Sequence, residues 1–191
     1  MKRRDALQQT GLILTSAVFG SGLMAALAGC ASEANLPDDV LVFDLKQYKL
    51  TRALGDTILP RTDSPAASDV KVTEFIDLLL HDVYDDATRD QFLSGIGTFD
   101  SDCQQVTGKS FLELSEEERY KYLVDLDEDV ISKNYTEKIP FYLTFKTLCV
   151  SVYYSTEAGI KQNLAYTPVP GGFDGDVPLR SGDLIEVGNE M

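Results

Sequence analysis

The one histidine of this 191-residue chain, His81, is the first side chain to consider as a catalytic acid, base or metal ligand. General acid–base and nucleophilic catalysis need partner groups at hydrogen-bond distance, and no Ser-His-Asp or Cys-His set can be assembled around His81 with any specificity. Zinc usually takes several Cys or His ligands, and these do not cluster in the sequence. We therefore expect His81 to be a partly buried polar residue, and we predict no catalytic and no metal-binding residue.

Two acidic runs could offer oxygen ligands to calcium, Asp82-Val83-Tyr84-Asp85-Asp86 and Asp125-Leu126-Asp127-Glu128-Asp129. Neither follows the EF-hand order, so we interpret both as solvated helix ends. No Gly-rich run opens a helix with Lys behind it, and Gly95-Ile96-Gly97 lacks the rest of the dinucleotide fingerprint. The sequence therefore predicts no cofactor-binding residue, and a protein that is not itself an enzyme.

Two alternatives exist for the cysteines in the body of the chain, Cys103 and Cys149. In an oxidising compartment they could form a disulfide, which would close a loop of about 45 residues and contribute about 3–4 kcal/mol in the chain-entropy model. They could instead be two buried thiols, which behave as small apolar residues. The sequence leaves both alternatives open.

The first thirty residues are typical of a bacterial export signal. A short basic region with Arg3 and Arg4 precedes an apolar stretch over 11–29, which is the layout of a secretory signal. The adjacent arginines, with Leu7 at an apolar position of the pattern, indicate a twin-arginine signal that a receptor reads as an address. Gly and Ser residues dilute the apolar stretch, and such weak hydrophobicity is more typical of twin-arginine than of Sec signals.

The apolar stretch ends in Leu27-Ala28-Gly29-Cys30, which resembles the lipobox of bacterial lipoproteins. Residues 1–29 would then be removed and the sulfur of Cys30 would carry a diacylglycerol. More than one acyl chain gives a stable anchor, at about 0.8 kcal/mol for each buried methylene. An uncleaved membrane anchor and an ordinary signal with a stray cysteine are the alternatives. We expect a lipid-anchored periplasmic protein, and the non-acidic residues after Cys30 favour the outer membrane.

Charge and length set the class of the remaining chain. The sequence has 31 acidic and 17 basic residues, a net charge of −14. So acidic a surface excludes nucleic acid as a partner, and it excludes binding to anionic lipid through a basic patch. The chain after the signal is long enough for one domain with its own core. We expect 30–41 to be a polar tether, 42–180 a single domain and 181–191 a C-terminal tail.

Apolar residues at helical spacing predict an all-α fold, a compact bundle of about five or six helices with a long C-terminal arm. The predicted helices cover about 41–59, 72–83, 86–97, 115–126, 138–155 and 157–164. Asp69 is the expected cap of the second helix, and Gly95 with Gly97 should end the third. Ser115 and Glu118 form a capping box for the fourth.

The C-terminal part is rich in proline and glycine from Tyr166 onward, which indicates an extended arm rather than a packed element. The chain has no strong alternating pattern of the kind that predicts a strand. An exposed arm of this composition can lie over the surface of a partner.

Two loops carry more information than helix periodicity, because the order of their residues is specific. They are Ile58-Leu59-Pro60-Arg61-Thr62-Asp63-Ser64-Pro65 and Tyr166-Thr167-Pro168-Val169-Pro170-Gly171-Gly172-Phe173-Asp174-Gly175. With the surrounding stretches 53–77 and 153–179, they resemble the gluconate 2-dehydrogenase subunit 3 family, the small subunits of membrane-bound sugar dehydrogenases. The likeness runs from about residue 43 to residue 180, and family members often carry a twin-arginine signal.

The resemblance implies an accessory subunit without a cofactor of its own. In such complexes a large flavoprotein of the glucose–methanol–choline type oxidises a sugar or polyol on FAD. A cytochrome c subunit can take the electrons, and the small subunit carries the export signal for the flavoprotein. The residues implied to bind the partner are Pro60, Arg61, Tyr166, Pro168, Pro170, Phe173 and Asp174.

One position departs from the family. Asp176 stands where members often have cysteine, so if that cysteine normally pairs near position 103, Cys103 needs another partner, for which Cys149 is the candidate.

A different function fits the anchor and the acidic surface equally well. In this alternative, the chain is a free-standing envelope lipoprotein that acts as a scaffold or binding module.

Overall fold

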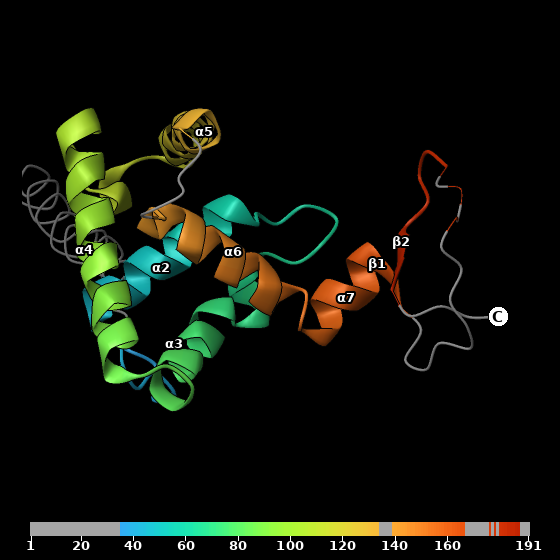
Figure 1. Ribbon diagram of the computed structural model, residues 1–191, viewed down its shortest axis with the longest axis horizontal. Helices are drawn as coiled ribbons and strands as arrows, with labels where there is room; N and C mark the ends of the chain where they lie inside the picture. The colour runs from blue at the N-terminus through green and yellow to red at the C-terminus, as the bar shows by residue number, and fades with distance from the viewer. Residues whose placement is uncertain (1–34, 134–138, 167–175, 177, 179, 188–191) are drawn as a thin grey trace, which may run out of the picture. The chain divides into compact units, whose positions relative to one another are not determined.

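A computed structural model of the protein confirms the all-α fold (Figure 1). It describes residues 35–133, 139–166, 176, 178 and 180–187. The helices are α2 (Leu45–Ile58), α3 (Val72–Asp82), α4 (Asp86–Thr107), α5 (Glu116–Lys133), α6 (Phe141–Tyr153) and α7 (Glu157–Asn163), with 3₁₀ turns η1 (Ala67–Val70) and η2 (Phe111–Glu113). Because α2 contacts α3, α4, α5 and α6, it is the central helix of the bundle. These elements belong to one compact unit, Leu36–Met191, and the predicted signal lies outside the described residues.

The domain begins with a segment that Asp77 fixes to α3. The carboxylate of Asp77 is fully buried and accepts the backbone N–H groups of residues 41, 42 and 43, at 2.6, 3.0 and 2.8 Å. The helix predicted over 41–59 therefore starts later, at Leu45, because the preceding N–H groups bind a side chain from another helix. Asp44 caps α2, and Pro60 follows the end of the helix.

Part of the predicted tether, 30–41, is folded onto the domain. The N–H of Val40 donates to the carbonyl of Pro37 at 3.1 Å, and the side chain of Val40 is buried in the core. Asp39 forms an ion pair with Lys71 at 3.2 Å. The compact unit therefore begins at residue 36, within the segment predicted to be a tether.

α3 buries only one side of the apolar stripe predicted over 72–83. Val72, Ile76 and Leu80 lie in the core. Phe75 and Val83 are 48% and 69% exposed, so they belong to the outer surface of the domain. The stripe is wider than the area that the neighbouring helices cover.

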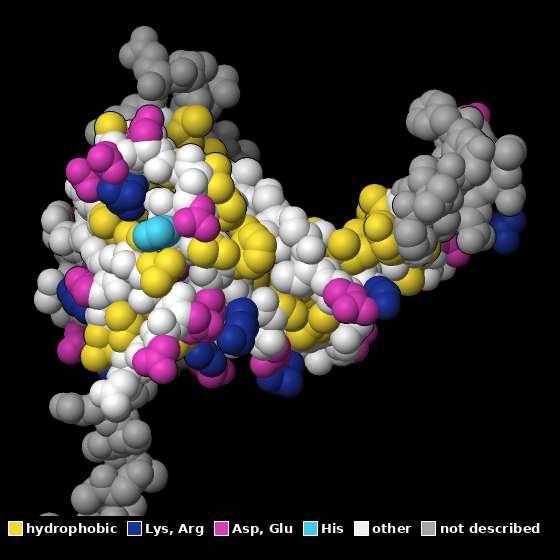
Figure 2. Space-filling view, turned by 90° about the horizontal axis from the view of Figure 1, so that it is seen from below, with side chains coloured by type: hydrophobic (Ala, Val, Ile, Leu, Met, Phe, Trp, Pro, Cys, Tyr) yellow, Lys and Arg dark blue, Asp and Glu magenta, His cyan; other side chains and the backbone are white. Residues whose placement is uncertain are grey.

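Asp69 and His81 differ from their predicted roles. Asp69 lies in η1, where its carboxylate pairs with Arg61, and Lys71, with a φ of 57°, precedes α3 instead of a side-chain cap. His81 is exposed rather than partly buried, and its Nδ1 lies 2.6 Å from the carboxylate of Asp82. Figure 2 shows the histidine on the outer face, among hydrophobic and acidic side chains.

α4 runs through the two glycines that the sequence predicts to end it. Asp85 caps its first turn, and the helix ends at Gly108, which has a φ of 78°. Its buried residues keep helical spacing from Phe92 to Cys103, across both glycines. Burial of this stripe outweighs the low helix propensity of glycine.

Gly95 and Gly97 have different surroundings and provide a matched pair of substitutions. A Cβ at Gly95 would meet the ring of Phe141, 2.7 Å from Cγ, whereas a Cβ at Gly97 would have nothing within 4 Å. We expect Gly95→Ala to lower the free energy of unfolding by about 1–3 kcal/mol through overpacking. We expect Gly97→Ala to raise it by about 0.5–1 kcal/mol, because alanine loses less backbone entropy in a helix. Urea unfolding measures both, and an equal loss at the two positions would contradict this account.

An aromatic cluster joins α4, η2, α5 and α6. Phe99 contacts Phe111 and Tyr122 edge to face, with ring centroids 5.2 and 5.9 Å apart. Phe92 contacts Phe141 in the same way at 5.1 Å. Such pairs add to the stabilisation that burial alone provides. The cluster therefore fixes η2 and the start of α5 against α4.

Asp100 adds hydrogen bonds between α4 and the segment that contains η2. Its carboxylate accepts hydrogen bonds from Lys46 at 2.8 Å, from the hydroxyl of Ser110 at 2.7 Å and from the N–H of Phe111 at 3.0 Å. Burial disfavours its charged form, but these hydrogen bonds outweigh burial and hold the pKa of the carboxyl below its usual value. A charged group from α4 thus fastens η2 to the core.

The capping box predicted for α5 is present. The N–H of Ser115 donates to the carboxylate of Glu118 at 2.8 Å, and the N–H of Glu118 donates to the hydroxyl of Ser115 at 3.3 Å. Pro140 is the N-cap of α6 and not a residue of its first turn, so the helix predicted over 138–155 begins later, at Phe141. Within the described ranges, no helix combines the length and the apolar character needed to cross a membrane.

After α7 the chain forms a short parallel strand pair that the sequence does not predict. β1 (Leu164–Tyr166) pairs with β2 (Ile185–Val187), which lies within the predicted C-terminal tail. Strands of three residues are too short to produce a recognisable alternating pattern. Tyr166, the predicted start of the arm, is therefore part of a strand, and arm residues 167–175 lie outside the described residues.

Candidate partner-binding groove

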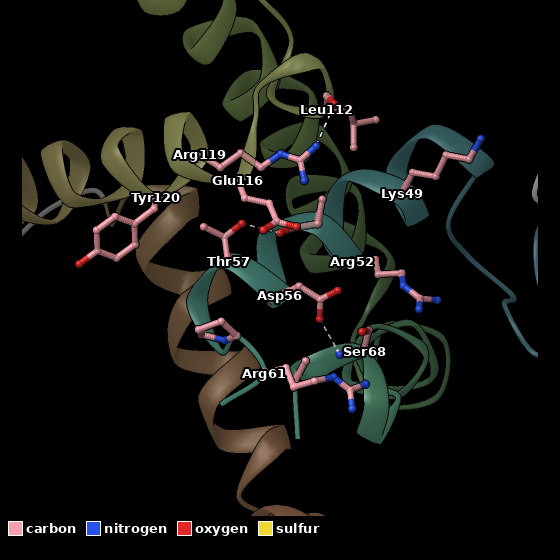
Figure 3. A pocket seen from close by; sticks show the side chains of 13 residues that line it. Lys49, Arg52, Asp56, Thr57, Arg61, Ser68, Leu112, Glu116, Arg119 and Tyr120 are labelled. Atoms are coloured by element: carbon pink, nitrogen blue, oxygen red, sulfur yellow. Dashed lines mark hydrogen bonds between the residues drawn. The ribbon is translucent and has the colours of Figure 1, made fainter. Parts of the chain in front are cut away.

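A groove of about 730 Å³ lies between α2, the loop that follows it, and the start of α5 (Figure 3). Its charged lining residues are Lys49, Arg52, Asp56, Arg61, Glu116 and Arg119. Three segments that are distant in the sequence contribute to it, so the tertiary fold creates the site. Its volume lies within the usual range of ligand-binding pockets.

α2 forms one wall of the groove because its two faces differ. Leu50 and Leu54 are buried in the core. Lys49, Arg52 and Asp56 are spaced by three and four residues, which places them together on the groove side of the helix. The amphipathic character of α2 thus separates the core from a charged surface.

The loop after α2 is closed by hydrogen bonds at its base. The carbonyl of Leu59 accepts the N–H of Ala67 at 3.0 Å, and the carboxylate of Asp56 accepts the N–H of Ser68 at 2.8 Å. The ion pair of Arg61 with Asp69 adds a third link. The loop is therefore fixed to α2, with Pro60 and Arg61 in the groove lining.

Arg119 approaches from α5 and is held by the backbone of η2. Its Nε and Nη2 donate to the carbonyls of Phe111 and Leu112, at 2.9 and 2.8 Å. Its Cζ also lies 5.5 Å from the centroid of the Phe111 ring, within range of a cation–π contact. The guanidinium therefore has a fixed position in the lining, and no carboxylate of the described residues forms an ion pair with it.

The charge of the groove is opposite to that of the chain. Its lining has four basic side chains and two acidic ones, whereas the sequence has 17 basic and 31 acidic residues. Among the described residues, neither Lys49 nor Arg52 forms an ion pair, and Arg52 donates only to the hydroxyl of Tyr48, at 3.3 Å. Because Asp69, outside the lining, already pairs with Arg61, the excess of positive charge in the groove comes from Lys49, Arg52 and Arg119.

The structure places two of the predicted partner-binding residues, Pro60 and Arg61, side by side in this groove. Tyr166 lies in β1 and is 48% exposed. The other predicted partner-binding residues, Pro168, Pro170, Phe173 and Asp174, lie outside the described residues. So do the predicted signal and lipidation residues Arg3, Arg4, Leu7 and Cys30.

Tyr153 connects the two stretches on which the family resemblance depends, 53–77 and 153–179. Its hydroxyl donates to the carbonyl of Pro65 at 2.8 Å and accepts a hydrogen bond from the side chain of Asn163 at 3.3 Å. Asn163 directly precedes β1, the strand that ends at the first residue of the second loop, Tyr166. Two stretches that are far apart in the sequence thus meet through one phenol group.

Cys103 and Cys149 are free and buried, so the structure has two thiols and not the possible disulfide. The sulfur of Cys103 lies 3.8 Å from the hydroxyl of Thr107 in its own helix, whereas Cys149 faces Gly55 of α2. Burial raises the pKa of Cys149 to about 12 and raises the pKa of Cys103 above its usual value. Both therefore stay protonated at neutral pH and pack as small apolar residues.

Sequence reasoning missed the groove residues Lys49, Arg52, Arg119 and Tyr120. The spacing of Lys49 and Arg52 on the polar face of a predicted helix is a signal, but an unspecific one, because solvated helix faces commonly carry such charges. No local pattern indicates that α5 brings Arg119 to the same place.

A second groove, of about 860 Å³, runs between α4 and α6 and is lined largely by apolar side chains, among them Phe92, Phe99 and Phe141. It offers no set of groups that could carry out a reaction. The described residues contain no cluster of three or more His, Cys, Asp or Glu side chains that could hold a metal ion. The charged groove at α2 is the stronger candidate site.

Comparison with known families gives an independent result. The model of the family described as gluconate 2-dehydrogenase subunit 3 matches residues 46–171. No curated protein and no solved structure matches the chain. The match spans α2 to β1 and includes the whole loop from Leu59 to Ala66. The chain therefore belongs to the gluconate 2-dehydrogenase subunit 3 family.

Proposed function

We propose that this chain is a non-catalytic accessory subunit of an FAD-dependent sugar or polyol dehydrogenase. It carries the flavoprotein subunit through twin-arginine export and anchors it to the membrane through a lipid on Cys30. The match to a subunit 3 family over residues 46–171 carries this proposal, because a family of that description associates with a larger dehydrogenase complex.

The signal sequence supports the carrier role. Arg3 and Arg4 fit an address that is read by the twin-arginine receptor, and that route transports folded proteins. A protein that must bind FAD before export needs such a route. In our proposal the FAD belongs to the flavoprotein partner, and this chain supplies the export signal for both proteins.

In this proposal the redox chemistry takes place in other subunits of the complex. The flavoprotein, of the glucose–methanol–choline type, oxidises the substrate on FAD, and a cytochrome c subunit can receive the electrons. This chain contributes a helical domain with exposed surfaces for the partner, and Cys30 holds the complex at the periplasmic side of a membrane. The non-acidic residues after Cys30 favour the outer membrane.

Affinity purification of the full chain tests this proposal. The tagged protein is expressed with its neighbouring genes, extracted in mild detergent and purified, and the eluate is examined for bound flavin. We expect a flavoprotein to co-purify in a fixed ratio to the chain and to disappear when the neighbouring genes are omitted. Recovery of the chain alone from the complete strain would reject the proposal in favour of a free-standing envelope lipoprotein.

A further inference from the structure

The groove at α2 gathers cations that the described part of the chain leaves without a carboxylate. Lys49 and Arg52 form no ion pair there, and Arg119 donates only to backbone carbonyls. Most other described cations, including Lys46, Lys109 and Lys146, do pair with a carboxylate. In a chain with 31 acidic residues, a group of unpaired cations in one groove is an exception to the general pattern.

The two acidic residues of the groove do not remove this excess. The carboxylate of Asp56 accepts the N–H of Ser68, which closes the loop after α2. Glu116 lies in the first turn of α5, where a carboxylate interacts favourably with the positive end of the helix dipole. Neither forms an ion pair with Lys49, Arg52 or Arg119. The hydrogen bond with Tyr48 is the main cause that raises the pKa of Arg52, and Asp56 and Glu74 contribute to this rise without forming an ion pair with it. Lys49 and Arg52 therefore remain able to pair with an external anion.

The arrangement of the cations indicates the kind of anion. Lys49 and Arg52 are one turn apart on α2, Arg61 lies on the following loop, and Arg119 comes from α5 (Figure 3). In Figure 3 the ends of these side chains do not converge on one point, and such an arrangement suits a peptide with several carboxylates better than one small ion. Arginine forms bidentate pairs with carboxylates, and Arg52 is exposed, whereas Arg61 already pairs with Asp69.

The uncharged lining points to a protein rather than to a small anion. Tyr120 is one of the lining residues of the groove and is 65% exposed. Tyrosine and arginine are the residues most enriched at the energetic centres of protein interfaces. An exposed aromatic side chain gives a peptide backbone or apolar side chain a surface to pack on, which a hydrated ion would not use.

We propose that this groove binds an acidic segment of the dehydrogenase partner, a stretch with several Asp or Glu residues that pairs first with Lys49 and Arg52. The inference rests on the proposed function for the identity of the partner. The strongly acidic surface elsewhere repels such a segment, so the groove fixes where and in which orientation the partner docks. Binding through these pairs is sensitive to ionic strength.

Charge reversal in the complete complex tests the inference. We expect Lys49→Glu to reduce co-purification of the flavoprotein, and Lys49→Glu with Arg52→Glu to weaken association at least about tenfold at low salt. The matched control is Lys121→Glu, which changes another exposed helical lysine by the same charge outside the groove and should leave association unchanged. Because Arg52 donates to Tyr48, Arg52→Gln serves as a milder variant, and circular dichroism verifies folding in each case.

The outcomes separate this inference from the proposed function. Equal recovery of the flavoprotein by the wild type, the double variant and the Lys121→Glu control would overturn the groove assignment and leave the proposed function intact. If the wild type recovers no flavoprotein, the proposed function fails, and binding of a labelled hexaglutamate peptide to the detergent-solubilised full chain tests the groove by itself. Loss of that binding in the double variant supports an acidic-peptide site. Displacement of the peptide by an equal concentration of inorganic phosphate shows a small-anion site instead and overturns the inference.

Discussion

Replacing Asp77 by alanine is expected to lower the free energy of unfolding by about 3–5 kcal/mol, the largest loss that we predict for a single substitution. The wild-type carboxylate is fully buried and accepts three backbone N–H groups, from residues 41, 42 and 43. Alanine would leave these donors without their acceptor; the bond from Phe43 is buried and those from Leu41 and Val42 are partly buried, and an unsatisfied buried group costs about 1–3 kcal/mol. Since domains of this size are stable by only about 5–15 kcal/mol, the variant should be close to unfolding at physiological temperature.

Two further variants make this prediction specific. Asp77→Asn keeps one carbonyl oxygen, which can replace Oδ1 and accept from residues 42 and 43, but its amide group would face the N–H of Leu41. Its loss of stability should therefore be intermediate. Asp90→Ala, on the exposed side of α4, should change stability by less than about 0.5 kcal/mol. Urea unfolding measures all three, and a midpoint for Asp77→Ala equal to that for Asp90→Ala would show that the three hydrogen bonds do not hold the N-terminal segment.

Changing both signal arginines to lysine is expected to abolish export of this chain and of its flavoprotein partner together. Arg3→Lys with Arg4→Lys preserves the positive charge of the signal, so any effect reports recognition of the arginine pair itself. In the proposed complex the flavoprotein depends on this chain for its address, and both proteins should then stay in the cytoplasm.

Cell fractionation and activity in intact cells measure this result. A membrane-impermeant electron acceptor should be reduced by intact wild-type cells and only by broken cells of the double variant. Lys2→Arg is the matched control, because it makes an equally small change next to the pair and should leave export unaffected. Export of the flavoprotein in the Arg3→Lys, Arg4→Lys strain would count against the carrier role.

Local sequence signals predict the helices well where the signal and the packing agree. The capping box at Ser115 and Glu118 is present as expected, since both partners are within one turn. α4 passes through Gly95 and Gly97 because its buried stripe continues beyond them, and the ring of Phe141 occupies the space that Gly95 leaves. Propensity at a single residue is a weak signal compared with burial along a whole face.

At the N-terminal boundary of the bundle, the local sequence signal and the tertiary packing disagree. Residues 41–43 have helical spacing with those that follow, but Asp77 accepts their N–H groups and keeps them out of α2. This side chain belongs to a helix more than thirty residues away along the chain. Contacts at such separation cannot be derived from the pattern of one segment.

The candidate groove was only partly predictable for the same reason. Pro60 and Arg61 stand out because the loop that contains them resembles a family pattern. Lys49 and Arg52 carry only the unspecific signal of a polar helix face, and Arg119 reaches the groove through the packing of α5 on η2. Thus the sequence indicates one edge of the groove, and the tertiary structure supplies the rest.

The folding of residues 36–43 onto the domain also limits the distance between the domain and a lipid anchor at Cys30. If Cys30 carries the lipid, as we propose, only residues 30–35 separate the membrane surface from the first residues of the compact unit. A fully extended chain spans at most about 3.3–3.6 Å per residue, so the linker 30–35 can span at most about 20 Å. A flavoprotein carried on the domain would be held against the bilayer surface and could not diffuse across the periplasm. Such confinement suits the transfer of electrons to an acceptor subunit that is held at the same membrane surface.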